Sequence, residues 1–168
     1  MESQVNADEL RALSAFAGEL ADIARDKAMH YFRSDVEIAI KSDATPVTRA
    51  DREIESKLRS LIANRYPHHG FFGEESGGSI GAGLGWVIDP IDGTKSFICG
   101  VPLFGCLIAL LADGKPVRYC SEIGERISRP VSFDDLSTSA PVEGWFGRES
   151  IFRSMEVSSR ARSGRSQQ

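Results

Sequence analysis

Two aspartates lie close together in Asp89-Pro90-Ile91-Asp92-Gly93-Thr94, directly after the apolar residues Trp86-Val87-Ile88. The apolar run predicts a buried strand that ends at Asp89, because Pro90 has no amide hydrogen and interrupts a strand ladder. The Asp-Gly pair predicts a tight turn, followed by a helix start with outward-facing backbone N–H groups. Carboxylates beside such amides suit a divalent metal ion and a phosphate group together. The alternative is a capped turn with two solvated aspartates, which is also common.

Two further acidic stretches favour the metal site. The residues Phe71-Phe72-Gly73 predict a short apolar strand that ends at Glu74 and Glu75, and Asp51 lies at the start of a predicted helix. Each acidic group therefore adjoins a segment that we expect to be buried. Like charges gathered at buried ends repel one another unless a cation lies between them.

These three segments, in this order and spacing, resemble the inositol monophosphatase superfamily of magnesium-dependent, lithium-sensitive phosphatases. The stretch from Asp89 to Leu111 is most similar to the histidinol-phosphate phosphatases of histidine biosynthesis, and Lys95-Ser96-Phe97 is the feature that favours them. The resemblance covers residues 7–117. Family members are longer and have a second α/β domain with a metal-binding Trp-Asp motif, whereas Trp145 is followed here by phenylalanine. We therefore expect a truncated chain that lacks this domain.

The resemblance implies a ligand set for two metal ions. Glu74, Asp89 and the backbone carbonyl of Ile91 would hold one Mg²⁺, and Asp89 would bridge to a second ion shared with Asp92. These hard oxygen donors select magnesium or manganese over zinc.

The resemblance also implies the catalytic residues. Asp51 and Thr94 would polarise the attacking water, together with Glu74, and the amides of Gly93 and Thr94 would hold the phosphate. From the residues alone, Asp51 is equally explained as the acidic partner of a capping box with Thr48.

The implied reaction is hydrolysis of histidinol phosphate to histidinol and phosphate by a metal-activated water. Alternative substrates within the superfamily are inositol 1-phosphate and nucleotide 3′-phosphates, which use the same metal residues. An alternative of another class is a truncated, catalytically impaired fragment that binds metal only. The expected partner is a small phosphorylated metabolite, and the resemblance implies a homodimer.

Composition gives no reason to expect nucleic acid or a membrane. The 168 residues carry a formal net charge of −4, and the run from Cys106 to Ala112 is far too short to span a bilayer. The three cysteines form no CxxC pair, which favours a reducing compartment, and the cytoplasm is the expected location.

We expect an α+β fold to position these residues. Two long helices would pack on an antiparallel sheet, with the acidic strand ends at one rim. Apolar spacing and caps predict a helix over 7–32, a half-buried strand over 36–40, a helix from Thr48 to Pro67, a flexible connector over 76–85, and a strand over 104–112 that ends in an Asp113-Gly114 turn. We expect residues 1–117 to form the N-terminal phosphatase domain and 118–168 a divergent tail, disordered from about 140 onward.

Overall fold

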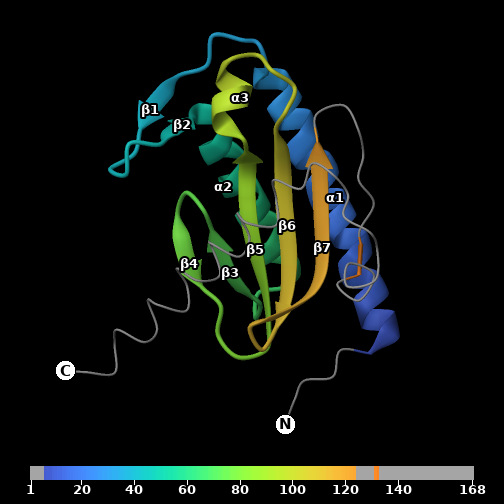
Figure 1. Ribbon diagram of the computed structural model, residues 1–168. Coiled ribbons are helices and arrows are strands. Elements are labelled where there is room, and N and C mark those ends of the chain that lie inside the picture. The colour runs from blue at the N-terminus through green and yellow to red at the C-terminus, as the bar shows by residue number, and fades with distance from the viewer. Residues whose placement is uncertain (1–5, 124–130, 133–168) are drawn as a thin grey trace, which may run out of the picture.

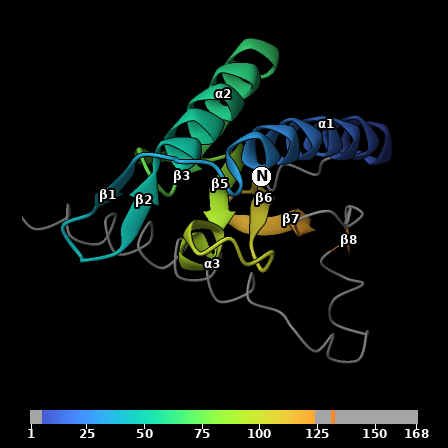
Figure 2. The ribbon, with the colours of Figure 1, turned by 90° about the horizontal axis from the view of Figure 1, so that it is seen from above.

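The computed structural model describes residues 6–123 and 131–132, with side chains up to residue 117. The helices α1 and α2 lie on one face of a six-stranded sheet, and the short α3 lies at one end of the sheet (Figures 1 and 2). This arrangement confirms the α+β fold. The elements, in chain order, are α1 (Ala7–Tyr31), β1 (Ile38–Ile40), β2 (Pro46–Thr48), α2 (Arg49–Arg65), β3 (Gly70–Gly73), β4 (Gly77–Ser79), β5 (Leu84–Asp92), α3 (Thr94–Ile98), β6 (Gly105–Ala112), β7 (Lys115–Ile123) and β8 (Val131–Ser132).

Local capping sets where both long helices begin. The Asn6 side chain accepts hydrogen bonds from the backbone amides of Asp8 and Glu9 at the start of α1. Thr48 and Asp51 form a reciprocal capping box at the start of α2, as predicted. Each helix then buries an apolar stripe against the sheet, so the helical predictions are confirmed.

The sheet has the strand order β4-β3-β5-β6-β7-β8, and its neighbours are antiparallel except for β3 and β5. The prediction of an antiparallel sheet was therefore wrong for this pair. Strands β3 and β5 run parallel because the chain crosses back through β4 and the following loop before β5 begins. Both strands consequently end at the same edge of the sheet.

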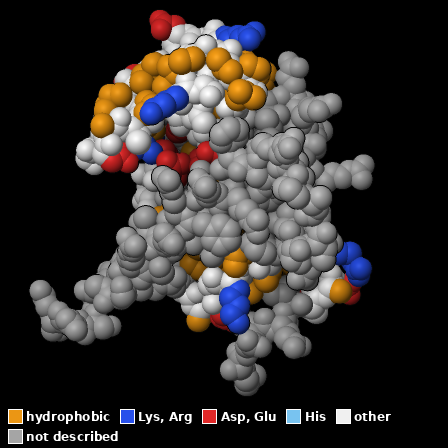
Figure 3. Space-filling view, in the orientation of Figure 1, with side chains coloured by type: hydrophobic (Ala, Val, Ile, Leu, Met, Phe, Trp, Pro, Cys, Tyr) orange, Lys and Arg blue, Asp and Glu red, His pale blue; other side chains and the backbone are white. Residues whose placement is uncertain are grey.

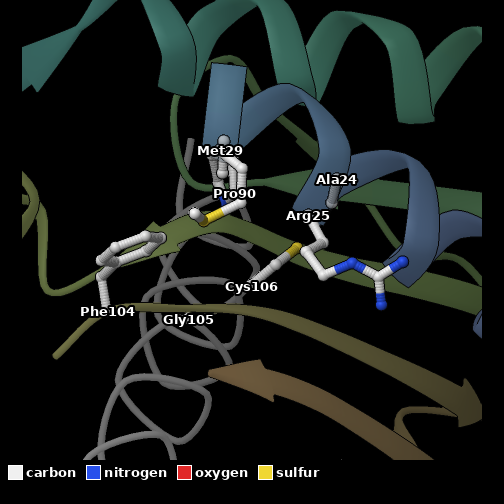
Figure 4. A pocket seen from close by; sticks show the side chains of 8 residues that line it. Ala24, Arg25, Met29, Pro90, Phe104, Gly105 and Cys106 are labelled. Atoms are coloured by element: carbon white, nitrogen blue, oxygen red, sulfur yellow. The ribbon is translucent and has the colours of Figure 1, made fainter. Parts of the chain in front are cut away.

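Strand β5 continues through Pro90 to Asp92, whereas the sequence predicted its end at Asp89. The pairing with β6 shifts register between Asp89 and Asp92, and such an irregularity leaves room for a residue without an amide hydrogen. Pro90 faces Met29 and Phe104 below α1 (Figure 4). The gap there has a volume of about 10 Å³, close to that of one water molecule, so it is a packing defect rather than a substrate pocket.

Two segments differ from their predictions. Ile38 and Ile40 are 48% and 68% exposed, because β1 pairs with β2 in a separate two-stranded sheet rather than with the main sheet. The predicted connector 76–85 contains β4, which pairs with β3 from Gly77 to Ser79. Close backbone approach explains Gly78, since a Cβ there would meet the carbonyl of Phe71, whereas Gly77 has a positive φ of 64°.

Buried apolar residues occupy both faces of the main sheet. The larger cluster joins the helices to the sheet through residues such as Leu20, Trp86 and Ile108. The smaller cluster lies on the opposite face and consists of Ile80, Val87, Leu107, Ala109 and Leu111. The nine-residue β5 and the eight-residue β6 are therefore buried along nearly their whole length.

Strand β7 runs past the predicted domain boundary at residue 117 and ends at Ile123. The Asp113-Gly114 turn before it has positive φ at both residues, as the hairpin prediction requires. The predicted disorder from about residue 140 lies outside the described residues. Within residues 6–123 and 131–132, no helix has both the length and the apolar character needed to cross a membrane.

Candidate metal centre

Buried polar side chains mark one region of the protein. Among the side chains that the structure describes, the buried polar or charged ones are Thr48, Asp51, Glu55 and Asp89. They come from the start of α2 and the end of β5. Charged groups are rarely buried without a partner, so their concentration here indicates a functional site rather than ordinary core.

The parallel pairing of β3 with β5 brings Glu74 beside Asp89. Gly73 lies opposite Ile88 in the register, and the backbone N–H of Glu74 donates to the Ile88 carbonyl over 3.0 Å. The two carboxylates thus follow adjacent strands at the same edge. Figure 3 shows acidic side chains gathered on the surface near this end of the sheet, with a basic side chain next to them.

Asp89 is the most perturbed acid of the site. Its side chain is 6% exposed, and its Oδ1 atom has no hydrogen-bond partner. Burial raises the pKa of Asp89 well above its ordinary value, and the negative charges of Glu74 and Asp92 raise it further. A buried carboxylate oxygen that lacks a donor and faces other carboxylates is the environment that a divalent cation would relieve.

Lys41 supplies a positive charge to the neighbouring pair of glutamates. Its Nζ atom lies 2.6 Å from Oε1 of Glu75 and 3.2 Å from Oε1 of Glu74. Although burial works against the charged ammonium group, hydrogen bonds to Glu75 and Glu74 raise the pKa of Lys41. The Glu75 side chain is 9% exposed, and its burial raises the pKa of that carboxyl group. Glu75 is therefore a half-buried partner of Lys41.

Asp51 links α2 to the turn after β5. Its Oδ2 accepts hydrogen bonds from the Thr48 amide at 2.8 Å and the Thr48 hydroxyl at 2.5 Å. The Thr94 hydroxyl lies 3.3 Å from Asp51 Oδ1 and 2.9 Å from the Ile91 carbonyl oxygen. Burial raises the pKa of Asp51, against the hydrogen bonds from Thr48 that favour the charged form. Asp51 is thus both a capping-box residue and a neighbour of Thr94.

Gly93 forms the turn between β5 and α3, and only glycine suits its conformation. Its φ is 86°, and a Cβ there would lie 2.8 Å from the Leu103 carbonyl oxygen. As the N-cap of α3, Gly93 offers no side chain to the helix amides. The phosphate contacts of the Gly93 and Thr94 amides stay a prediction.

The oxygen donors around Asp89 are of the type that hard divalent cations prefer, because they are carboxylate and carbonyl oxygens. Their side chains are not arranged as a complete coordination site. No group of three or more His, Cys, Asp or Glu side chains, among those described, is arranged to hold a metal ion. Lys41 accounts for part of this difference, since it engages Glu74 and so competes for one predicted ligand.

Comparison with known proteins shows which family this fold belongs to. Residues 9–119 match the inositol monophosphatase family over most of the described chain. The chain belongs to the inositol monophosphatase family.

Individual relatives agree with this assignment. The chain is 44% identical to the histidinol-phosphatase of Mycobacterium tuberculosis over 110 residues, which are 65% of this chain and 41% of that protein. It is 48% identical to the histidinol-phosphatase of Chlorobaculum parvum over 98 residues, which are 57% of this chain and 38% of that protein. The solved extragenic suppressor protein SuhB of Bartonella henselae superimposes with a TM-score of 0.64 at 27% identity, covering 73% of this chain and 52% of that one. The chain therefore spans less than half the length of either histidinol-phosphatase.

The structure brings the predicted residues together, since Asp89 interacts electrostatically with Glu74, Asp92 and Asp51, and Asp51 contacts Thr94. Sequence reasoning missed Glu55, which is 2% exposed. A signal was present: Glu55 follows Asp51 by four residues, which places both on one side of α2 next to the buried Ile54 and Leu58.

Proposed function

We propose that this chain is the metal-binding part of a magnesium-dependent phosphatase that hydrolyses histidinol phosphate to histidinol and phosphate. Family membership and the two histidinol-phosphatase relatives support the reaction and the substrate. The observation that carries the proposal is the buried Asp89 carboxylate, which has an unpartnered oxygen next to Glu74 at the ends of two parallel strands.

In this proposal Glu74, Asp89, Asp92 and the Ile91 carbonyl hold the metal. A bound Mg²⁺ lowers the pKa of water and neutralises charge on the phosphate oxygens. The protein contributes a rigid strand end for Asp89 and a negative cluster that favours a cation over a neutral ligand. Lys41 forms an ion pair with the Glu74 carboxylate, so this ion pair must loosen before Glu74 can bind the metal.

Asp51 and Thr94 position and deprotonate the attacking water. The Thr94 hydroxyl has a single proton to donate, and it lies within reach of both Asp51 and the Ile91 carbonyl. When this proton points to Asp51, the Ile91 carbonyl is available to a cation and the hydroxyl oxygen can accept a hydrogen bond from water. Burial raises the pKa of Asp51, so this carboxylate accepts a proton more readily than an exposed aspartate does.

A phosphate-release assay with three substrates tests the proposal. Histidinol phosphate, inositol 1-phosphate and a nucleotide 3′-phosphate are each incubated with the chain, in EDTA and in saturating MgCl₂. We expect magnesium-dependent release that is fastest with histidinol phosphate and is lost in Asp89→Asn. The matched control is Asp26→Asn, because the Asp26 side chain is 78% exposed on α1.

Three results contradict parts of the proposal. Faster release from inositol 1-phosphate would replace the substrate and keep the reaction class. Magnesium binding in a calorimeter without turnover of any substrate would leave the metal-binding fragment as the function. Release that is unaffected by EDTA would remove the metal from the mechanism.

A further inference from the structure

Glu55 is a buried carboxylate that the proposed chemistry does not use. It lies on α2 and is 2% exposed, and its neighbours along the helix, Ile54 and Leu58, are buried as well. A charge at such a position is costly unless hydrogen bonds satisfy it. The contacts of Glu55 therefore show what this residue does.

Both oxygens of Glu55 bind the turn that follows β3. Oε2 accepts from the backbone N–H of Glu75 over 2.7 Å, and Oε1 accepts from the backbone N–H of Ser76 over 2.9 Å. The Ser76 hydroxyl also donates to Oε1. Hydrogen bonds to an ionised acceptor are about twice as strong as neutral ones, so this carboxylate fixes the turn firmly.

The residue before the turn has no room for a side chain. A Cβ on Gly73 would overlap the Glu55 carboxylate and would lie 2.6 Å from its Oε2 atom. The glycine therefore lets the carboxylate lie directly against the backbone of β3. The contact between Glu55 and the turn therefore requires glycine at position 73.

Glu74 is held on both sides as a result. Its own N–H donates to the Ile88 carbonyl of β5, and the next N–H along the chain, that of Glu75, donates to Glu55. The first bond sets Glu74 beside Asp89, and the second fixes the direction in which the chain leaves the strand.

Arg59, also on α2, binds the same turn. One turn beyond Glu55, its guanidinium donates to the Ser76 hydroxyl over 2.6 Å and to the Gly77 carbonyl over 2.7 Å. Asp51, Glu55 and Arg59 thus follow one another at intervals of four residues, and all three contact the rim of the sheet.

We propose that Glu55 is a positioning residue that holds Glu74 in place for metal binding, by acting as a buried acceptor for the turn amides. This inference rests on the proposed function, since it assigns to Glu74 the role of a ligand. Groups that orient a metal ligand commonly change metal affinity 10- to 100-fold when they are removed. The Glu55 carboxylate acts on Glu74 through the backbone and does not touch substrate.

The test is Glu55→Gln in the full chain, with Mg²⁺ affinity measured by titration calorimetry and amide hydrogen exchange measured in EDTA. Glutamine keeps the size of the side chain but replaces one acceptor oxygen by an NH₂ group, which faces an N–H donor of the turn. We expect Mg²⁺ affinity to fall about 10-fold or more, and the amides of Glu75 and Ser76 to exchange faster before any metal is added.

Ile62→Val is the matched control, because Ile62 is 1% exposed on the same helix, seven residues beyond Glu55. A merely structural role for Glu55 predicts that both variants lose stability while both keep wild-type Mg²⁺ affinity. Unchanged affinity in Glu55→Gln, next to clear binding by the wild type, would overturn this inference alone. A wild-type chain that fails to bind Mg²⁺ would overturn the proposed function and this inference with it.

Discussion

Replacing Asp89 by asparagine should change the stability of the protein in opposite directions with and without Mg²⁺. Asp89 is 6% exposed, and its Oδ1 atom is unpartnered. A buried polar group without a hydrogen bond costs about 1–3 kcal/mol. Asparagine removes the negative charge and offers an NH₂ donor to the neighbouring carboxylates, so Asp89→Asn should stabilise the metal-free protein by about 1–2 kcal/mol.

Magnesium should reverse this order. A ligand at one hundred times its dissociation constant stabilises a protein by about 2.7 kcal/mol. The wild type should gain this stabilisation, and Asp89→Asn should not, because it lacks the carboxylate that would hold the metal. The variant should therefore be more stable than the wild type in EDTA and less stable in saturating MgCl₂.

Thermal unfolding followed by circular dichroism measures both effects. A change of 1 kcal/mol corresponds to a shift in Tm of roughly 2–4 °C for a chain of this size. Asp26→Asn should behave as the wild type in both buffers, because its side chain is exposed. The reasoning is refuted if Asp89→Asn lowers Tm in EDTA and still gains stability from Mg²⁺, because Asp89 would then be neither a strained charge nor a ligand.

Three further perturbations test the fold around the site. Leu58→Ala empties a fully buried position and should lower the free energy of unfolding by about 2–5 kcal/mol in urea denaturation. Gly93→Ala places a Cβ at a φ of 86°, 2.8 Å from the Leu103 carbonyl oxygen, and should cost about 1–3 kcal/mol and weaken phosphate binding in calorimetry. His69 Nδ1 accepts a hydrogen bond from the Trp86 indole over 3.1 Å, and burial lowers the pKa of His69. The contribution of neutral His69 to stability is therefore present above about pH 6.5, the ordinary pKa of histidine, and is lost as the pH falls. Urea unfolding between pH 7.5 and 5.5 should show the free energy of unfolding falling with pH in the wild type, and falling less in His69→Gln.

The pH behaviour of His69 was not evident from the sequence. His69 lies in the loop before β3, where its ring stacks on Tyr66 and its Nδ1 accepts a hydrogen bond from the Trp86 indole. An indole partner from a strand seventeen residues away leaves no local signature.

The sequence by itself determined the features that depend on neighbouring residues. Asn6 starts α1, Thr48 and Asp51 start α2, and the Asp113-Gly114 pair turns β6 into β7, because each is a matter of local hydrogen bonds and allowed φ. The acidic residues at the ends of apolar runs also predicted a metal site before any geometry was known.

Tertiary structure alone decided how these residues meet. Glu74 lies beside Asp89 because β3 and β5 pair in parallel with Gly73 opposite Ile88, and no local pattern states which strand edges will join. Long-range contacts also left Ile38 exposed, because β1 pairs with β2 outside the main sheet, and gave Glu55 of α2 its turn amides. Local bonds set the elements of this protein, and the burial of their apolar faces against distant partners set the site.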